Sequence, residues 1–130
     1  MNFYRIEHIN KACQNLETTK QFYQTLFPDW FIRAQEKSDD FNWMHFGDRQ
    51  FYLSLYERAN ASQPVPHDTG NIDHVGVVIE DGEKMMALLD ANGIEYFVED
   101  APETKHRIYV KDPDGTFLEL VEYNEDYELR

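Results

Sequence analysis

The chain has 130 residues, enough for one compact domain or for two small half-domains that share a core. Its 25 acidic residues against 12 basic ones give a net charge of −13, which repels nucleic-acid backbones and anionic membranes. We therefore expect small molecules or another protein as partners, and neither nucleic acid nor membrane. The single cysteine, Cys13, excludes an intrachain disulfide. Because no signal peptide and no run of about 20 apolar residues occurs, we expect a cytoplasmic protein.

Signals in the first half follow the order strand, helix, strand, strand, strand. A helix is predicted from about Glu17 to Phe27, because its apolar residues recur at helical spacing, with Asn15 or Thr18 as the N-cap. Pro28 then ends this helix. Strand-like runs follow at about Trp30–Ala34, Phe41–Phe46 and Gln50–Tyr56.

The second half repeats this order. Val75 and Val77 alternate with His74 in a first strand, so the histidine faces away from the packed side. A helix is predicted between an N-cap at Asp81 and a left-handed stop at Asn92-Gly93. Strands follow at about Tyr96–Val98, Arg107–Val110 and Thr116–Glu122; the turn Asp112-Pro113-Asp114-Gly115 precedes the last one, as Gly47-Asp48 does in the first half.

The two halves match as copies of one module. A shift of 66 residues (74 − 8) superimposes His8 on His74, and a shift of 65 (119 − 54) superimposes Ser54 on Glu119. The sequence therefore predicts an α+β fold of two βαβββ modules, in residues 1–58 and 71–123. A linker at 59–70 and an acidic tail at 124–130 lie outside them.

Two histidines and one carboxylate occupy corresponding parts of these modules. His8 and His74 lie in the first strands, and Glu119 lies in the last strand between Leu118 and Leu120. Because side chains alternate along a strand, the two leucines can pack beneath a helix while Glu119 turns to the opposite face. Two histidines and one carboxylate are the ligands of non-haem iron and related centres, where they leave positions open on the ion. We therefore expect these three residues to bind a divalent metal ion.

Further side chains are predicted to share the face of the metal ligands. Tyr52 and Ser54 do so by strand parity, and Ser54 takes the position that Glu119 has in the second module. Arg107 and Tyr109 share one face of their strand, where Arg107 could hold a substrate carboxylate or form a plain salt bridge. Candidates for substrate contact that could equally be packing residues are His45, His106, Phe41 and Trp43.

Paired βαβββ modules with a histidine in each first strand, and Asp112-Pro113-Asp114-Gly115 followed by a strand bearing Glu119, resemble the vicinal oxygen chelate superfamily. Its members include glyoxalase I, fosfomycin-resistance transferases, extradiol dioxygenases and bleomycin-binding proteins. The resemblance covers nearly the whole chain. It implies a cupped, barrel-like mixed sheet with the helices outside, a metal ion in the cup, and a homodimer in which modules of different chains can complete each cup.

Departures from the family pattern separate its branches. Ser54 replaces the Glu or Gln that glyoxalase I has in this strand of both halves, and a hydroxyl cannot shuttle a proton as a carboxylate does. The bleomycin-binding members lack the metal ligands. A fosfomycin enzyme would have a hydroxyl where Asn10 stands, and a basic C-terminal segment. Tyr109 favours an extradiol dioxygenase, because it resembles a tyrosine that hydrogen-bonds a catecholate oxygen in those enzymes. The acid/base histidine of those enzymes is absent from the matching stretch here, Tyr56-Glu57-Arg58-Ala59, and His67 is only a distant candidate for that role.

The sequence is therefore interpreted as that of a divalent-metal enzyme acting on a small molecule with vicinal oxygens, with an extradiol dioxygenase as the favoured type. The expected ion is Fe(II) or Mn(II), with Zn(II) or Ni(II) as other options. Tyr109 is the expected catalytic residue, and the expected substrate contacts are Ser54, Tyr52, Trp43, His45 and Arg107. Alternatives are a non-catalytic protein that sequesters a small molecule, and a lyase or transferase of the glyoxalase or glutathione type.

Overall fold

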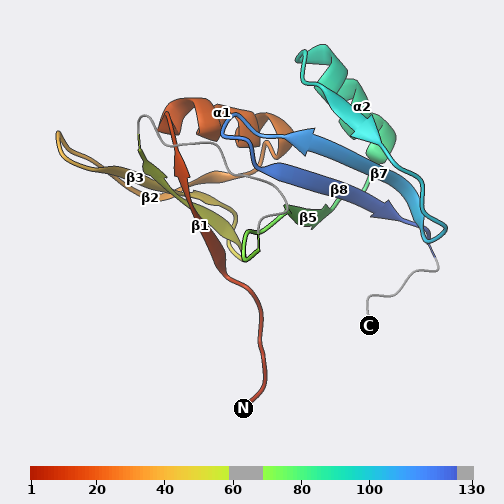
Figure 1. Cartoon of the computed structure of the whole chain (residues 1–130), viewed down its shortest axis with the longest axis horizontal. Helices are drawn as coiled ribbons and strands as arrows, with labels where there is room; N and C mark the ends of the chain where they lie inside the picture. The colour runs from red at the N-terminus through yellow and green to blue at the C-terminus, as the bar shows by residue number, and fades with distance from the viewer. Residues whose placement is uncertain (59–68, 126–130) are drawn as a thin grey trace. The chain divides into compact units, whose positions relative to one another are not determined.

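The computed structural model describes residues 1–58 and 69–125, which fold as two compact units, Met1–Ser62 and Gln63–Arg130 (Figure 1). Each unit has one four-stranded mixed sheet and one helix in the order βαβββ, so the predicted α+β fold is confirmed. Most of the predicted linker and tail, and His67, lie outside the described residues, and those boundaries stay predictions. Within the part of the chain that the structure describes, no helix is both long and apolar enough to cross a membrane.

Unit 1 places its first strand beside its last. Its sheet has the order β1-β4-β3-β2, in which β1 runs parallel to β4 and the other neighbours are antiparallel. The elements are β1 (His8–Cys13), α1 (Leu16–Leu26), β2 (Phe31–Lys37), β3 (Asn42–Gly47) and β4 (Tyr52–Glu57).

Unit 2 has the same topology. Its sheet order is β5-β8-β7-β6, again with the first and last strands parallel. The elements are β5 (His74–Val78), α2 (Gly82–Ala91), β6 (Tyr96–Val98), β7 (Thr104–Lys111) and β8 (Phe117–Tyr123).

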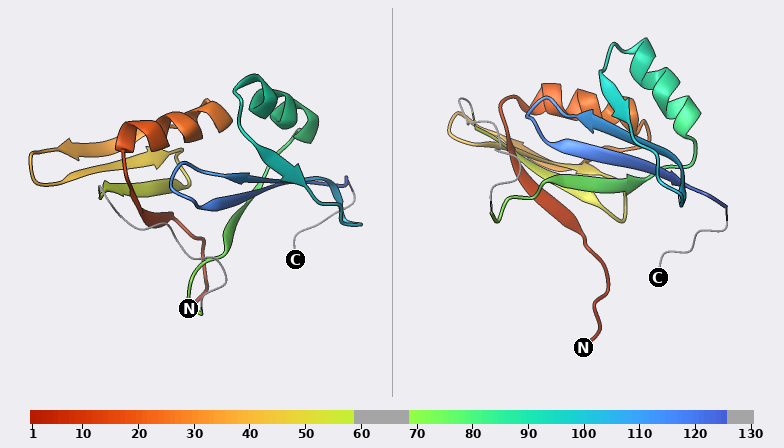
Figure 2. Two further views of the ribbon diagram at one scale, coloured as in Figure 1. Left: turned by 45° about the horizontal axis from the view of Figure 1, so that its top comes forward. Right: turned by 45° about the vertical axis from the view of Figure 1, so that its right-hand side comes forward.

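Each helix covers one face of its own sheet, and the core lies between them (Figure 2). The apolar residues on the inner face of each helix, and those that the strand alternation assigns to the helix side of each sheet, are buried, each stabilising the fold by about 1.5–3 kcal/mol relative to exposure. In unit 1 they are Leu16, Tyr23, Leu26, Met44, Phe46, Leu53 and Leu55; in unit 2 they are Leu89, Ile108, Val110, Leu118 and Leu120. The residues that alternate with these along each strand point to the opposite face of the sheet.

The helix ends form as the sequence predicts. Asn15, rather than Thr18, is the N-cap of α1, and its side chain accepts a hydrogen bond from the backbone N–H of Thr18 at 2.9 Å. Asp81 caps α2 in the same way. Gly93 follows α2 with a φ of 65°, a left-handed conformation that glycine adopts without strain.

Strand bounds differ most where the residues are polar. β2 extends to Lys37, three residues beyond the predicted end, and all its residues are exposed. β7 starts at Thr104, before the predicted Arg107. In both cases backbone pairing with the neighbouring strand forms the extension, which a hydrophobic pattern does not reveal.

A carboxylate at or near the end of the last strand joins that strand to the start of the helix in each unit. In unit 1, Glu57 accepts a hydrogen bond from the N–H of Leu16, the first residue of α1, at 3.1 Å. In unit 2, Glu122 accepts one from the N–H of Gly82, the first residue of α2, at 2.7 Å. Such N–H groups lack a partner within their helix, and the helix dipole favours a negative charge there. The shifts between the two pairs, 66 (82 − 16) and 65 (122 − 57), are those of the sequence repeat.

Glu122 also binds two basic residues of β7. Its carboxylate lies 2.7 Å from His106 Nδ1 and 3.2 Å from Lys105 Nζ. The bond from the Gly82 N–H, followed by those from His106 and Lys105, lowers the pKa of Glu122 to about 2. His106 therefore lies on the helix side of the sheet, which removes it from the candidates for substrate contact.

The close approach of α2 to β7 depends on a glycine. A Cβ at Gly82 would lie 2.4 Å from Cβ and Cγ of His106, so we expect Gly82→Ala to lower the free energy of unfolding by about 1–3 kcal/mol. Gly76→Ala is the matched control, because a Cβ there meets nothing within 4 Å. Urea unfolding followed by circular dichroism measures both, and equal stability of the two variants would contradict the predicted clash.

The depressed pKa of Glu122 predicts a pH-dependent contribution to stability. A carboxyl whose pKa is about 2 when folded, against 4.5 as its ordinary value, stabilises the fold above pH 4.5 and loses that effect as the pH falls towards 2. We expect Glu122→Gln to cost about 1–3 kcal/mol at pH 7 and less at pH 2. Urea unfolding across this pH range, with Glu95→Gln at an exposed position as the control, measures the difference. A difference independent of pH would refute the assignment.

Candidate metal centre

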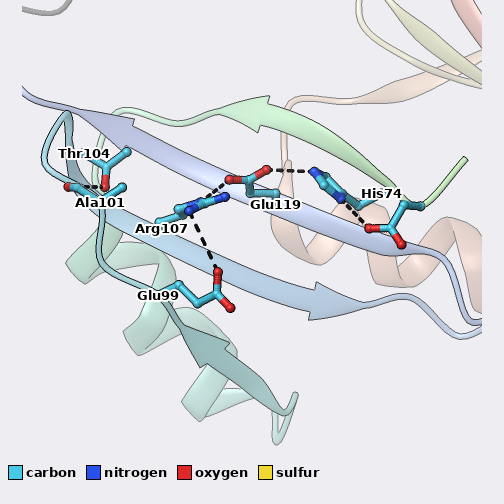
Figure 3. Close-up of polar contacts among 7 residues, drawn as sticks. His74, Glu99, Ala101, Thr104, Arg107 and Glu119 are labelled. Atoms are coloured by element: carbon cyan, nitrogen blue, oxygen red, sulfur yellow. Dashed lines mark hydrogen bonds and ion pairs between the residues drawn. The ribbon is translucent and has the colours of Figure 1, made fainter. Parts of the chain in front are cut away.

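Two of the three predicted ligands lie together in unit 2. The parallel register pairs His74 with Phe117 and Gly76 with Glu119, which puts both predicted ligands on the face away from α2. His74 Nε2 lies 3.0 Å from Glu119 Oε2 (Figure 3). Gly76 leaves the space beside Glu119 open, since a Cβ there would meet no atom within 4 Å.

The second ring nitrogen of His74 and the second carboxylate oxygen of Glu119 also have partners. His74 Nδ1 lies 2.8 Å from a carboxylate oxygen of Asp73. Arg107 Nε donates a hydrogen bond to Glu119 Oε1, and Arg107 Nη1 lies 3.8 Å from Glu99 (Figure 3). The bond to Glu119 is the main reason why the pKa of Arg107 is raised. The predicted role of Arg107 in substrate binding stays a prediction, and in this structure its guanidinium is engaged by carboxylates.

Tyr109 lies directly beside Glu119. The two residues are register partners on β7 and β8. The Tyr109 ring stacks on Phe97 with centroids 4.8 Å apart, and its edge meets the His74 ring at 6.0 Å. Burial, followed by the charge of Glu119, raises the pKa of the Tyr109 phenol. The hydroxyl is therefore a neutral hydrogen-bond donor at pH 7, held next to a predicted ligand.

The third predicted ligand, His8, lies in unit 1 at the equivalent position. His8 is the first residue of β1, as His74 is of β5, and pairs with Tyr52. Its ring stacks on that of Tyr52 with centroids 4.9 Å apart, and its Nδ1 lies 3.0 Å from Glu7 Oε1. The Tyr52 hydroxyl also donates to Glu7, at 3.1 Å. These two bonds, the one from His8 first, lower the pKa of Glu7.

Ser54 stands where unit 2 has the predicted carboxylate ligand Glu119. It pairs with Asn10 on β1 and accepts a hydrogen bond from the Asn10 amide at 3.0 Å. The neutral pair Asn10 and Ser54 in unit 1 thus occupies the positions that Gly76 and Glu119 have in unit 2. Sequence analysis identified Ser54 but not its bond to Asn10.

The predicted substrate-contact residues of unit 1 form one aromatic surface beside Ser54. His45 pairs with Ser54, and its ring lies 4.9 Å from that of Trp43 and 4.6 Å from that of Tyr52. Burial first, and then the nearby charges of His8 and Arg33, lower the pKa of His45, which favours a neutral ring. Tyr52 and Ser54, which the sequence predicted on one face, thus share it with Trp43 and His45, and their contact with a substrate stays a prediction.

Three residues next to the predicted candidates, Glu7 and Arg33 in unit 1 and Asp73 in unit 2, were not identified from the sequence. The Arg33 guanidinium lies 4.4 Å from the centre of the Tyr52 ring, at a register shift in β2 between Ile32 and Ala34 that the sequence does not indicate. Glu7 and Asp73, by contrast, had a visible signal, because each directly precedes a predicted histidine ligand.

The family comparison covers most of the chain. The model of the Glyoxalase/Bleomycin resistance protein/Dioxygenase superfamily matches residues 5–120. No curated protein matches the chain.

Solved structures share the fold. A glyoxalase family protein from Enterococcus faecalis is 23% identical, with a TM-score of 0.76 over 94% of this chain and 100% of its own. A glyoxylase/bleomycin resistance protein/dioxygenase domain from Frankia is 15% identical, with a TM-score of 0.78 over 95% of this chain and 100% of its own. A variant of the fosfomycin resistance protein FosX from Listeria monocytogenes, complexed with Mn(II) and 1S,2S-dihydroxypropylphosphonic acid, is 18% identical, with a TM-score of 0.75 over 96% of this chain and 97% of its own.

At these identities the structures establish a common fold, and the family match confirms the resemblance that the repeat and its histidines predicted. The chain belongs to the glyoxalase/bleomycin resistance protein/dioxygenase superfamily.

Proposed function

We propose that this protein is a divalent-metal-dependent enzyme that acts on a small molecule with two neighbouring oxygens, with His8, His74 and Glu119 as its metal ligands. The observation that carries the proposal is the 3.0 Å separation of His74 Nε2 and Glu119 Oε2. Bonds of about 2.1 Å at a right angle separate two ligand atoms by about 3.0 Å, so this nitrogen and this carboxylate oxygen are spaced as two ligands of one metal ion.

The third ligand comes from the repeat. His8 occupies in β1 the position that His74 has in β5. Taken by itself, neither unit brings three His, Cys, Asp or Glu side chains together for an ion among its described residues. We therefore propose that the ion draws His8 from unit 1 and the other two ligands from unit 2, of one chain or of two chains in a homodimer.

The ligand chemistry favours Fe(II) or Mn(II). Two imidazoles and one carboxylate with open positions are typical of non-haem iron centres, and Zn(II) and Ni(II) also accept imidazole. The family member FosX binds Mn(II), which supports a divalent ion here. When bound, the ion would polarise the substrate oxygens and stabilise the anion that develops on them.

The remaining residues fit a planar substrate. Tyr109 presents a neutral hydroxyl beside Glu119, where it can donate a hydrogen bond to a substrate oxygen. Trp43, His45 and Tyr52 offer aromatic rings for stacking on the face that bears Ser54. Within the family we therefore propose an extradiol-type dioxygenase, active on a catechol in the cytoplasm, as the first reaction to test.

The second candidate function is a non-catalytic binder. It is favoured by the aromatic surface of unit 1, since stacking on these rings requires no metal ion. Ligand binding that a chelator leaves unchanged would distinguish this function from the metal-dependent one.

Metal content tests the proposed site directly. Protein purified without oxygen is expected to bind about one Fe(II) or Mn(II) per chain, measured by elemental analysis, and His74→Ala and Glu119→Ala are expected to lose it, because each removes a ligand atom. Glu80→Ala, which removes an exposed charge near the end of β5, is the matched control and should keep the metal. Unchanged metal content in the ligand variants would refute the assignment.

The catechol reaction is tested through Tyr109. We expect Tyr109→Phe to lower kcat/KM for catechol cleavage roughly 10- to 100-fold, since it removes one hydrogen bond to a charged oxygen, while the metal content stays unchanged. Tyr96→Phe is the control, because the Tyr96 hydroxyl bonds only the exposed Asp90 among the described residues. Absence of ring cleavage by the Fe(II)-loaded wild type would reject the dioxygenase and leave the metal site standing.

A further inference from the structure

Each proposed histidine ligand is bonded by the carboxylate that directly precedes it. Glu7 Oε1 lies 3.0 Å from His8 Nδ1, and Asp73 Oδ2 lies 2.8 Å from His74 Nδ1. The two pairs are related by the 66-residue shift (73 − 7) of the repeat. The same contact therefore forms at equivalent positions of two units whose sequences otherwise differ.

The position of these carboxylates relative to the strands makes the contact possible. Consecutive side chains within a strand point to opposite faces, which would keep the two residues apart. Glu7 and Asp73 each lie one residue before their strand begins, where this alternation does not yet apply. In unit 1 the arrangement is further fixed, because the Glu7 carbonyl accepts a bond from the N–H of Tyr52 at 3.2 Å and its carboxylate binds the Tyr52 hydroxyl.

This contact decides which ring nitrogen is left for the ion. An ionised carboxylate only accepts hydrogen bonds, so the histidine nitrogen beside it must carry a proton. With the proton on Nδ1, the lone pair of a neutral imidazole is on Nε2. In His74 this atom is the one that faces Glu119, so an ion bound to it would lie beside the Glu119 carboxylate.

We propose that Glu7 and Asp73 are positioning residues that hold the rings of His8 and His74 with Nε2 as the metal-binding atom. The inference rests on the proposed metal site and deepens it. Hydrogen-bonded carboxylates of this kind fix the orientation of the ring and increase its basicity, and their loss typically weakens metal binding about 10- to 100-fold.

The metal affinity is measured by titration of the purified chain with Mn(II). Asp73→Ala and Glu7→Ala are each expected to weaken Mn(II) binding about 10- to 100-fold. Asp73→Asn and Glu7→Gln are expected to restore part of the affinity, because an amide oxygen still accepts the Nδ1 proton. Glu80→Ala controls for the lost charge. Tyr52→Phe controls for the second bond of Glu7, since it removes the hydroxyl and keeps the stacked ring.

A second measurement requires no metal ion. Nitrogen NMR of the metal-free chain above pH 8 reports which nitrogen of the neutral His8 ring carries the proton. We expect Nδ1–H in the wild type and in Glu7→Gln, and a shift towards Nε2–H in Glu7→Ala.

The two measurements separate the inference from the proposed function. Wild-type protein that binds no Mn(II) but has Nδ1–H on His8 would refute the metal site and uphold the role of Glu7 in orienting the ring. Wild-type affinity in both alanine variants, or a His8 tautomer that Glu7→Ala leaves unchanged, would overturn the positioning role even if the metal site is correct.

Discussion

The bond between a last-strand carboxylate and the first N–H of the helix fixes which face of each sheet bears the site. Glu122 points towards α2, and Glu119 lies three positions earlier on the same strand, so its side chain must point to the opposite face. The same relation holds in unit 1 between Glu57, bonded to α1, and Ser54. A slip of one residue in either last strand would turn these site residues towards the helix and separate the carboxylate from the helix N-terminus. Helix capping and site geometry are therefore coupled in both units.

The two units share this framework and differ in the chemistry of the face that points away from the helix. Unit 2 carries a charged chain of contacts from Asp73 through His74 and Glu119 to Arg107. Unit 1 keeps the carboxylate–histidine pair but has Ser54 bonded to Asn10 in place of Glu119, next to the rings of His8, Tyr52 and His45. Unit 2 thus has the more charged face and unit 1 the more aromatic one.

The sequence predicted those features that depend on local chemistry. The N-caps at Asn15 and Asp81, the glycine stop at Gly93 and the alternation that separates Glu119 from Leu118 all arise from neighbouring residues, and all are confirmed. The bonds from Glu57 and Glu122 to the helices were not predicted, because each joins residues about 40 positions apart and neither residue breaks a local pattern. The place of Arg33 depends on a register shift in an exposed strand, where no hydrophobic pattern constrains the pairing.

Charge at the candidate site of unit 2 bears on the order in which the proposed metal ion and substrate would bind. Three carboxylates, Asp73, Glu99 and Glu119, surround His74 and Arg107, so with a neutral imidazole this group carries a net charge of −2 (three negative charges and one positive). A divalent cation would bring that charge to zero, and such an ion is often the largest local charge in its site. Under the proposed function, this group would repel an anionic substrate such as a catecholate until a bound ion neutralised it. The charges would therefore favour binding of the metal before the substrate in this strongly acidic protein.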